Sequence, residues 1–377
     1  MIPSTIRRFR PAFIVLLSAF ALGTLSAQKT VIPDIPGYKT LQCDFHIHTV
    51  FSDGVVWPTV RVDEAAREGL SAIALTEHVE SRRFVKDEAT SRNAAHDAAR
   101  SAAKAKNIIL IRGAEITREM PPGHLNAIFL KDCNPLATEN WRDALAEAKK
   151  QGAFITWNHP GWDRQQAHTT RWWPEHDEIY KNGWLHGIEI ANNWLYSPEA
   201  FQWALDKKLT LIGASDAHQP VPFYIDYAKG EHRTMTLVFA KERTAAGIRE
   251  ALDNRRTAVL CGERIFGEEQ WLRPILEKSL VVQKIDHVPP APKYKARVTI
   301  TLKNNSGLIF RLKKVVPGEK PLHYREYTVK PNGQLTLNVG PAEESGSDEV
   351  NFEVTNFLTT PEKALTYTVK IPKPATP

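Results

Sequence analysis

Between residues 41 and 261 the chain alternates short apolar runs with longer amphipathic stretches. Short apolar runs predict buried strands, and the stretches between them repeat apolar residues at helical spacing. This alternation is typical of repeated β/α units around a parallel sheet, and it predicts an α/β fold, a TIM-like barrel of roughly seven or eight such units. The predicted strands are 41–45, 72–75, 108–111, 125–130, 153–157, 187–190, 209–212, 235–239 and 257–260.

Residues that favour helix ends mark several of the predicted helices. Pro58 suits the first turn of a helix and Gly69 suits a helix end, so the first predicted helix runs from Pro58 to Glu68. Gly152 ends another helix in the same way. The remaining predicted helices are 94–105, 141–150, 198–207 and 244–254.

The pattern changes after Val288, where Pro289, Pro290 and Pro292 predict a stiff linker. Beyond it, apolar and polar residues alternate in segments separated by turns such as Pro331-Asn332-Gly333, which predicts a small antiparallel β-sandwich of the Ig-like type. The predicted domains are therefore a barrel at residues 28–288, followed by the linker and the sandwich at 289–377. No cluster of acids and histidines lies in the sandwich, so we expect it to serve packing or binding.

The first 27 residues have the layout of a secretory signal. Arg7, Arg8 and Arg10 precede an apolar run at 12–22, and small residues follow up to Ala27. The apolar run is shorter than the roughly 20 residues that a membrane span needs. We therefore expect a signal peptide at 1–27 and a periplasmic or secreted protein with no membrane span after its removal.

Charge and cysteine content exclude some functions. The formal net charge is +6, and it falls to +3 without the three arginines of the first 27 residues. So small a charge, with no basic cluster interleaved with aromatics, gives no signal for nucleic-acid binding. The cysteines Cys43, Cys133 and Cys261 form no CxxC pair, so neither a thiolate zinc site nor a disulfide framework is predicted.

A His-x-His pair closes the first predicted strand. His46 and His48 are two residues apart, and Asp53 follows beyond a short turn. Strand residues two apart face the same side, so the two imidazoles can hold one cation. Such a pair alone is weak evidence.

The same residue types recur where later strands meet their loops, which is where barrel active sites are assembled. Mixed imidazole and carboxylate donors favour zinc, manganese or iron over calcium or magnesium. The set is large enough for two or three divalent cations that share bridging groups. The candidate metal ligands are His46, His48, Asp53, His78, Glu115, His124, His159, Asp216 and His218.

With these motifs the chain resembles the polymerase and histidinol phosphatase (PHP) superfamily of metal-dependent phosphoesterases, over about residues 41–262. The shared motifs are the HxHTxxSDG opening at 46–54, Glu-His at 77–78, GxE at 113–115, the isolated His124, His-Pro at 159–160 and DxH at 216–218. The resemblance implies three cations in a distorted barrel. It assigns them as follows: His46, His48, Glu115 and Asp216 to the first, Glu115, His124 and His159 to the second, and Asp53, His78 and His218 to the third. Asp53 stands where some members carry His.

In its domain arrangement and motifs, the chain is most similar to bacterial Sb-PDE-type phosphodiesterases. The similarity rests on its signal segment, its GAEITREMPPGH stretch at 113–124 and its C-terminal β module. This similarity implies that organophosphate diesters are the substrates. A hydroxide bridging two cations is then the expected nucleophile, since bound metal lowers the pKa of water by many units. No side-chain nucleophile is needed.

Substrate contacts are less well specified. Arg118, just after Glu115, and Arg171, beside Trp172 and Trp173, are candidates for binding a phosphate oxygen. Trp162 is a candidate wall of the site. It belongs to a group of indoles in the loops after ligand-bearing strands that either line the site or pack the outer layer of the barrel. This group comprises Trp162, Trp172, Trp173, Trp184 and Trp194.

The sequence leaves the substrate class open. A small-molecule phosphate ester is the expected partner, and the sequence does not decide between phosphodiesters and phosphomonoesters. An amidohydrolase-like metal hydrolase is a second possibility, although such enzymes usually need a metal-bridging lysine, and no lysine closes a strand between His78 and Asp216. A non-catalytic surface-binding protein is a third, but a degenerate site would have lost ligands.

Overall fold

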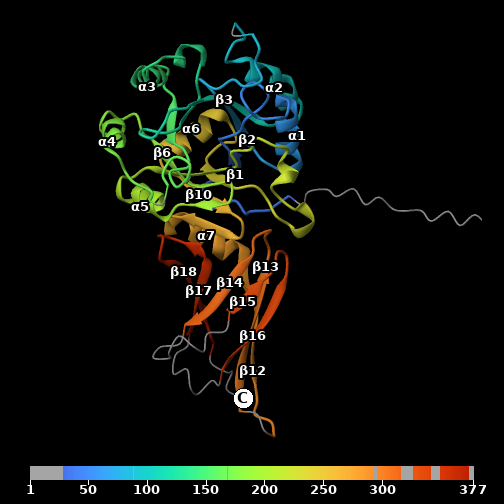
Figure 1. The fold of residues 1–377 in the computed structure, drawn as a ribbon. Coiled ribbons are helices and arrows are strands. Elements are labelled where there is room, and N and C mark those ends of the chain that lie inside the picture. The colour runs from blue at the N-terminus through green and yellow to red at the C-terminus, as the bar shows by residue number, and fades with distance from the viewer. Residues whose placement is uncertain are drawn as a thin grey trace, which may run out of the picture.

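The computed structural model describes residues 29–372, with gaps at 88, 168, 293–294, 316–325 and 341–348. The signal peptide predicted at 1–27 lies outside the described residues. Within the described part of the chain, no helix is long and apolar enough to cross a membrane. These residues form an α/β barrel and a smaller β module, which lies below the barrel in Figure 1.

The barrel confirms the predicted TIM-like α/β fold, but its sheet is mixed. The strand order is β9-β1-β2-β3-β4-β5-β6, with β8 paired to the other edge of β6. β1, β2 and β3 run parallel to one another, as do β5, β6 and β8, whereas β4 is antiparallel to both neighbours and β9 is antiparallel to β1. The bounds are β1 Lys39–Asp44, β2 Ala72–His78, β3 Ile109–Ile116, β4 Leu125–Ile128, β5 Phe154–Trp157, β6 Gly187–Asn192, β8 Thr210–Ala214 and β9 Met235–Ala240.

The reversal of β4 follows from its short connection to β3. Parallel neighbours need a crossover of about a dozen residues or more, whereas only residues 117–124 lie between Ile116 and Leu125. The chain therefore turns back beside β3. As a result, the first residue of β4 lies at the same end of the barrel as the last residues of β1, β2, β3, β5 and β8.

Side chains complete the barrel between β8 and its neighbours β9 and β10 (Thr257–Cys261). The hydroxyl of Thr236 accepts from the N–H of Gly213 at 3.0 Å and donates to its carbonyl at 2.8 Å, and the hydroxyl of Thr257 donates to the carbonyl of Leu211. A Cβ at Gly213 would lie only 2.3 Å from a methyl group of Val259. Glycine is therefore required where these strands meet.

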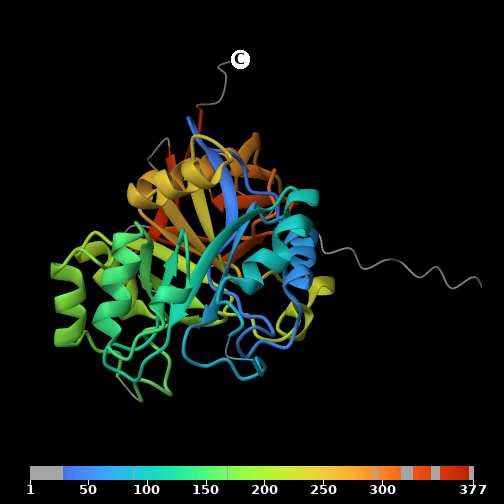
Figure 2. The ribbon, with the colours of Figure 1, turned by 90° about the horizontal axis from the view of Figure 1, so that it is seen from above.

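Five of the helices, α1 to α5, cover the outside of the sheet in two groups, which Figure 2 shows from above. α1 and α2 pack together on one side, and α3, α4 and α5 lie on the other. α1 begins at Pro58 and ends before Gly69, whose φ of 82° is left-handed, as predicted. Two helices, α4 and α7, were not predicted, and α7 contains Pro274, a residue that disfavours helix interiors. The bounds are α1 Pro58–Glu68, α2 Ala94–Ala105, α3 Trp141–Lys150, α4 Pro174–Lys181, α5 Pro198–Asp206, α6 Ala245–Asp253 and α7 Glu269–Ser279.

The C-terminal module is the predicted antiparallel sandwich. One sheet contains β12, β13 and β16, and the other contains β15, β14, β17 and β18. Buried side chains such as Ile300, Leu302, Phe310 and Val354 fill the space between the sheets. The bounds are β12 Leu280–Val288, β13 Arg297–Asn304, β14 Phe310–Val315, β15 Glu326–Val329, β16 Gln334–Gly340, β17 Glu349–Leu358 and β18 Ala364–Lys370.

The module begins earlier in the chain than the domain boundary predicted at 288/289. β12 ends at Val288 and pairs with β13 from Leu280 onward, so the proline-rich segment after it connects two strands of one sheet. The barrel and module also share a sheet, because β11 (Arg264–Gly267) pairs in parallel with β17 at Ile265 and Phe357. Hydrogen bonding of this kind fixes the module to the barrel.

Candidate metal centre

The nine candidate ligands meet at one end of the barrel. His46 and His48 follow β1, Glu115 lies near the end of β3, and the reversed β4 brings His124 to the same end. The loop after β8 is tied to the segment after β1, since the N–H of Asp216 donates to the carbonyl of His46 at 2.9 Å and Ile47 bridges Ala217. Residues from distant parts of the chain therefore share one site.

Two of these residues have strained backbones. His159 has a φ of 31° and Asp216 a φ of 51°, in the left-handed region that residues other than glycine rarely adopt. Such conformations persist only where the surroundings enforce them, and they are frequent at functional sites. Here the strain turns both side chains toward the cavity that they line.

The donor atoms form four overlapping groups, within each of which all donor atoms lie within 4.8 Å of one another. Glu115 is shared by two groups and lies at the centre, with Oε1 3.3 Å from Nε2 of His46 and 3.2 Å from Nδ1 of His124. Oδ1 of Asp216 lies 3.2 Å from Nε2 of both His46 and His48. The groups are His48–Asp53–His78–His218, His46–His159–Asp216, His46–His48–Glu115 and His78–Glu115–His124.

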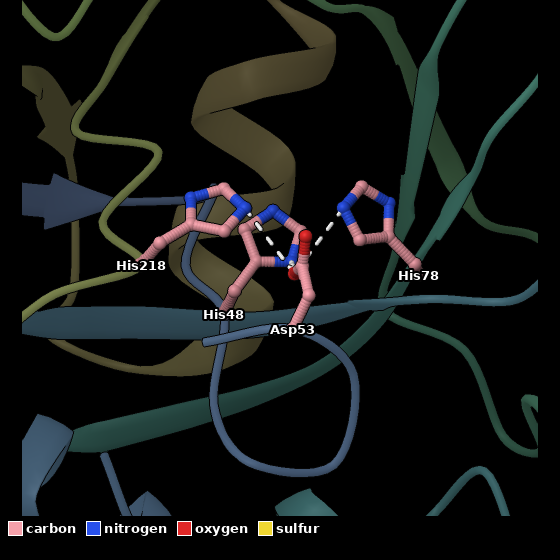
Figure 3. A group of neighbouring side chains, drawn as sticks. All are labelled: His48, Asp53, His78 and His218. Carbon is pink, nitrogen blue, oxygen red and sulfur yellow. Dashed lines mark ion pairs between the residues drawn. The ribbon is translucent and has the colours of Figure 1, made fainter. Parts of the chain in front are cut away.

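The group at the outer side of the site is drawn in Figure 3. Asp53 lies between two imidazoles, and its Oδ1 is 3.2 Å from Nε2 of His218 and 3.4 Å from Nε2 of His78. The ring of His48 stacks on both imidazoles, with centroid distances of 4.4 and 4.2 Å. The structure thus brings together the three residues that the family resemblance assigns to a third cation.

The chemistry of these contacts fits divalent cations. Nδ1 of His46 donates to Oε1 of Glu189 at 2.8 Å, so Nε2, 3.0 Å from Nε2 of His48, is the atom available to a cation. Burial disfavours the charged form of His46, but Asp216, Glu189 and Glu115 hold its pKa well above the usual value, so a cation at Nε2 has to displace a proton. Nδ1 of His159 is buried without a hydrogen-bond partner among the described residues, whereas Oε2 of Glu115 lies 2.7 Å from Nδ1 of His78. Two donors each about 2.1 Å from one ion are themselves about 3.0–3.5 Å apart, which is the spacing found here. Carboxylate oxygens and imidazole nitrogens this close to one another need protons or cations between them, and divalent cations can replace the protons.

The electrostatics of the site keep its carboxylates ionised. Burial opposes the charge of Glu115, but the surrounding His78, His46 and His124 hold its pKa well below the usual value. Asp216 is partly buried, which also opposes its charge, but His46 and His48 hold its pKa well below normal. Both groups are therefore anionic near neutral pH and ready to bind cations.

The imidazoles differ in their protonation. Burial, with His78 and His218 nearby, lowers the pKa of His48 to about 3, so its ring is neutral and can donate a lone pair. Burial also disfavours the charged form of His78, but Glu115 and Asp53 outweigh it and raise the pKa of His78 to about 10. Cation binding at His78 therefore has to displace a proton.

Buried residues behind the ligands hold them in place, and sequence reasoning missed these residues. Glu189 in β6 accepts from His46 and, through Oε2, from the backbone N–H of His159 at 2.8 Å and the amide of Asn192 at 2.9 Å. The amide of Asn158 donates to Oε1 of Glu115 at 2.7 Å. A carboxylate inside the otherwise apolar strand Gly187–Asn192 was the available signal for Glu189.

Two further buried groups organise the ligand-bearing loops. Glu77 accepts from the N–H and hydroxyl of Thr49 and from the hydroxyl of Ser52, and so orders the turn that carries Asp53. The guanidinium of Arg61 donates to the carbonyls of three residues on both sides of the site, at 2.8–2.9 Å. These carbonyls belong to His48, Ala217 and Gln219.

Seven of the nine candidate ligands line a cavity of about 700 Å³, and the other two, His46 and His48, are fully buried. Trp162 lines it, as predicted, with its ring 5.1 Å from that of His159. Trp194 lines it as well, whereas Trp172 and Trp184 pack against the barrel core and Trp173 donates to Gln166. The prediction that indoles line the site thus fits Trp162 and Trp194.

The two predicted phosphate-binding arginines are not among the described residues that line this cavity. Arg118 forms an ion pair with Glu80 and donates to the carbonyl of Thr138 at 2.6 Å. Arg171 is exposed on another loop. Arg164 lines the cavity, with its guanidinium 5.9 Å from the ring of Trp162, and is the lone arginine or lysine among the lining residues described.

Comparisons with known proteins agree with both parts of the fold. Residues 44–183 match the PHP domain, and residues 284–370 match an Ig-like domain, DUF5001. A two-domain protein from Bacteroides vulgatus, which contains a predicted PHP-like metal-dependent phosphoesterase, is 52% identical, with a TM-score of 0.84. The alignment covers 91% of this chain and 98% of that one.

Other solved structures are much less similar. A candidate metal-dependent phosphoesterase from Bifidobacterium adolescentis is 18% identical with a TM-score of 0.39, over 48% of this chain and 89% of that one. An amidohydrolase from Chromobacterium violaceum is 16% identical with a TM-score of 0.38, over 58% of this chain and 97% of that one. No protein with a curated description matches the chain.

Proposed function

The chain belongs to the PHP family, and from this premise we propose that it is an exported, metal-dependent phosphodiesterase. The observation that carries the proposal is the convergence of nine imidazole and carboxylate side chains around Glu115 at the mouth of the barrel. We propose that all nine are metal ligands, arranged as the family resemblance implies, with Glu115 shared between two cations. Zinc, manganese or iron suits this donor set.

Divalent cations bound at these positions would lower the pKa of a water molecule and neutralise charge on a phosphate ester. The residues of the chain supply the rest of the site. Glu189 fixes the ring of His46 through Nδ1, so that Nε2 points toward Asp216 and the other donor groups. Trp162 and Trp194 form apolar walls, and the exposed guanidinium of Arg164 can reach a phosphate oxygen.

Two features of the cavity favour a diester over a monoester. A monoester carries a second negative charge near neutral pH, which calls for additional cationic groups, whereas Arg164 is the lone arginine or lysine in the described lining. The volume of about 700 Å³ and the two indole walls leave room for a second ester arm. A monoanionic diester with an apolar arm fits such walls better.

An amidohydrolase-type reaction is less well supported. Such sites usually place a lysine between two cations, and among the described residues that line the cavity there is no lysine. Export rests on residues 1–27 alone. It would be tested by cell fractionation, in which mature protein retained in the cytoplasm would contradict it.

Metal content and turnover of matched esters test the proposed activity. The purified protein should contain zinc, manganese or iron and should hydrolyse bis(p-nitrophenyl) phosphate faster than p-nitrophenyl phosphate. Preference for the monoester would identify a phosphomonoesterase. A metal-free protein, inert towards both esters after addition of manganese or zinc, would support the non-catalytic alternative.

Substitution of one candidate metal ligand distinguishes a loss of activity from a loss of folding. His159→Ala should remove most of the activity and leave the unfolding temperature of the metal-free protein nearly unchanged, since His159 lies at the cavity. His287→Ala, on β12 far from the donor groups in the sequence and outside the cavity lining, is the matched control. Activity of His159→Ala close to that of His287→Ala would contradict the assignment.

A further inference from the structure

A second cavity of about 590 Å³ lies between the barrel and the β module. The barrel lines it with Trp194 and Leu260, and the module lines it with Ile309 and Thr328. The β11–β17 ladder holds the two parts together at this junction. The walls of the cavity are therefore fixed relative to each other.

Trp194 lines both this interdomain cavity and the catalytic cavity. Its side chain is 43% exposed, and the neighbouring Leu195 is 41% exposed. Large apolar side chains left open to water where two cavities meet are typical of ligand-binding surfaces, because a ligand that covers them gains hydrophobic free energy. The exposed indole thus contributes to the walls of both cavities.

The indole is held in position by its backbone. Trp194 lies in the tight turn between β6 and β7 (Leu195–Tyr196), where Asn193 has a φ of 50°. The N–H of Asn193 donates to the carbonyl of Ala214 at 2.9 Å, and its own carbonyl accepts from the hydroxyl of Thr234. On the other side, the indole packs close to Gly262, where a Cβ would lie 3.5 Å from the ring, at van der Waals distance.

The lining of the interdomain cavity indicates the chemistry of its ligand. Apolar side chains, among them Leu260, Ile309 and Pro331, form one part of the lining together with Trp194. The rest of the lining contains charged residues of both signs, which are Lys229, Glu231, Glu263, Arg311 and Lys330. An indole favours a flat aromatic partner, which it contacts over a large area. This lining is suited to an aromatic group.

We propose that the interdomain cavity is a substrate subsite that receives a bulky aromatic arm of a phosphodiester whose phosphate lies at the metal centre. The inference rests on the proposed phosphodiesterase function. In this proposal, residues of the β module contribute to substrate specificity. The arm that occupies the subsite is the one retained on phosphorus, while the other arm leaves.

Two diesters with the same leaving group test this subsite. Methyl p-nitrophenyl phosphate and biphenylmethyl p-nitrophenyl phosphate release the same phenolate, so they differ in the retained arm. For the metal-loaded protein we expect a KM about tenfold lower for the biphenylmethyl diester, since buried aromatic contacts of this kind carry much of a binding energy. The corresponding biphenylmethyl phosphonate should bind more tightly than the methyl phosphonate in calorimetric titrations.

A variant that fills the cavity from the module provides the sharper test. Thr328 is exposed on β15, so Thr328→Trp should leave the fold intact while blocking the subsite. In this variant the KM of the biphenylmethyl diester should rise to that of the methyl diester, and the biphenylmethyl phosphonate should bind no more tightly than the methyl phosphonate. The metal content and the KM of the methyl diester should stay the same. Thr366→Trp, at an exposed position of β18 outside the cavity lining, is the matched control and should change neither substrate.

The outcomes separate the two proposals. Turnover of both diesters with equal KM, or a Thr328→Trp variant that still prefers the biphenylmethyl diester, would overturn the subsite while leaving the phosphodiesterase function standing. Failure of the metal-loaded protein to hydrolyse either diester would overturn the proposed function itself, and the subsite with it.

Discussion

Replacement of Glu189 by glutamine probes how the metal centre is held together. Both carboxylate oxygens of Glu189 accept hydrogen bonds, from Nδ1 of His46 at 2.8 Å and from the backbone N–H of His159 at 2.8 Å. The amide of Asn192 also donates to Oε2, at 2.9 Å. Glutamine keeps the shape of the side chain but offers one oxygen and one NH₂ group. The NH₂ group must then face an N–H donor on one side.

The size of the effect follows from these contacts. Glu189 positions two candidate ligands that approach Glu115 from different strands, His46 with Nε2 at 3.3 Å and His159 with Nε2 at 3.6 Å from Oε1. Substitution of a residue that orients metal-bound histidines typically reduces metal affinity or activity by about 10- to 100-fold. That range corresponds to about 1.4–2.7 kcal/mol of binding free energy. We expect Glu189→Gln to fall within it.

Competition with a chelator measures this loss directly. Metal retained by the wild type and by Glu189→Gln would be quantified by mass spectrometry after equilibration with graded concentrations of chelator. Glu199→Gln, which changes an exposed carboxylate on α5, is the matched control and should behave like the wild type. If Glu189→Gln retained its metal as well as Glu199→Gln does, the orienting role argued for Glu189 would be refuted.

Three further substitutions test other parts of the structure. Asp53→Ala should reduce the number of metal ions per chain, because Asp53 links His78 and His218 (Figure 3), and an unchanged stoichiometry by mass spectrometry would contradict a separate outer cation site. Arg61→Met should lower the free energy of unfolding by roughly 3–5 kcal/mol in denaturant titrations, because it leaves Glu64 and several buried carbonyls without their partner. Arg67→Met, which changes an exposed residue of the same helix, is the control and should have little effect. Equal unfolding midpoints for the two variants would argue against the role given to Arg61. Gly213→Ala should lower the free energy of unfolding by roughly 1–3 kcal/mol, because its Cβ would lie 2.3 Å from a methyl group of Val259. The double variant with Val259→Ala should recover part of this stability. If it recovered none, the contact with Val259 would not be the cause of the loss.

The sequence predicted the β/α units well where a strong local pattern was present. α1 begins at Pro58 and ends at Gly69, as those residues favour. α7 was missed because Pro274 weakens the helical signal, although the helix packs Leu272, Ile275 and Leu276 into the core. β12 was assigned to the barrel side of the boundary, since the prolines after it suggested a linker and the pairing partner β13 lies beyond them.

The direction of β4 could not be predicted from the apolar pattern. The apolar run after His124 predicted a strand but gave no indication of its direction. The short connection at 117–124 forces β4 back beside β3, and this reversal is what places His124 beside Glu115, with Nδ1 3.2 Å from Oε1. Connection length, rather than the apolar pattern, contained this information.

The sequence by itself determined which residues are candidate metal ligands, because imidazoles and carboxylates that follow buried strands must emerge at a strand end. It also determined the α/β barrel and the β-sandwich, since hydrophobic periodicity is a local property of the chain. Only the tertiary structure decided which donors share an ion, that Glu189 and Arg61 hold them, and that Arg164 rather than Arg118 lines the cavity. These features depend on distances between residues far apart in the sequence, and such distances are set when the sheet closes and the loops pack against one another.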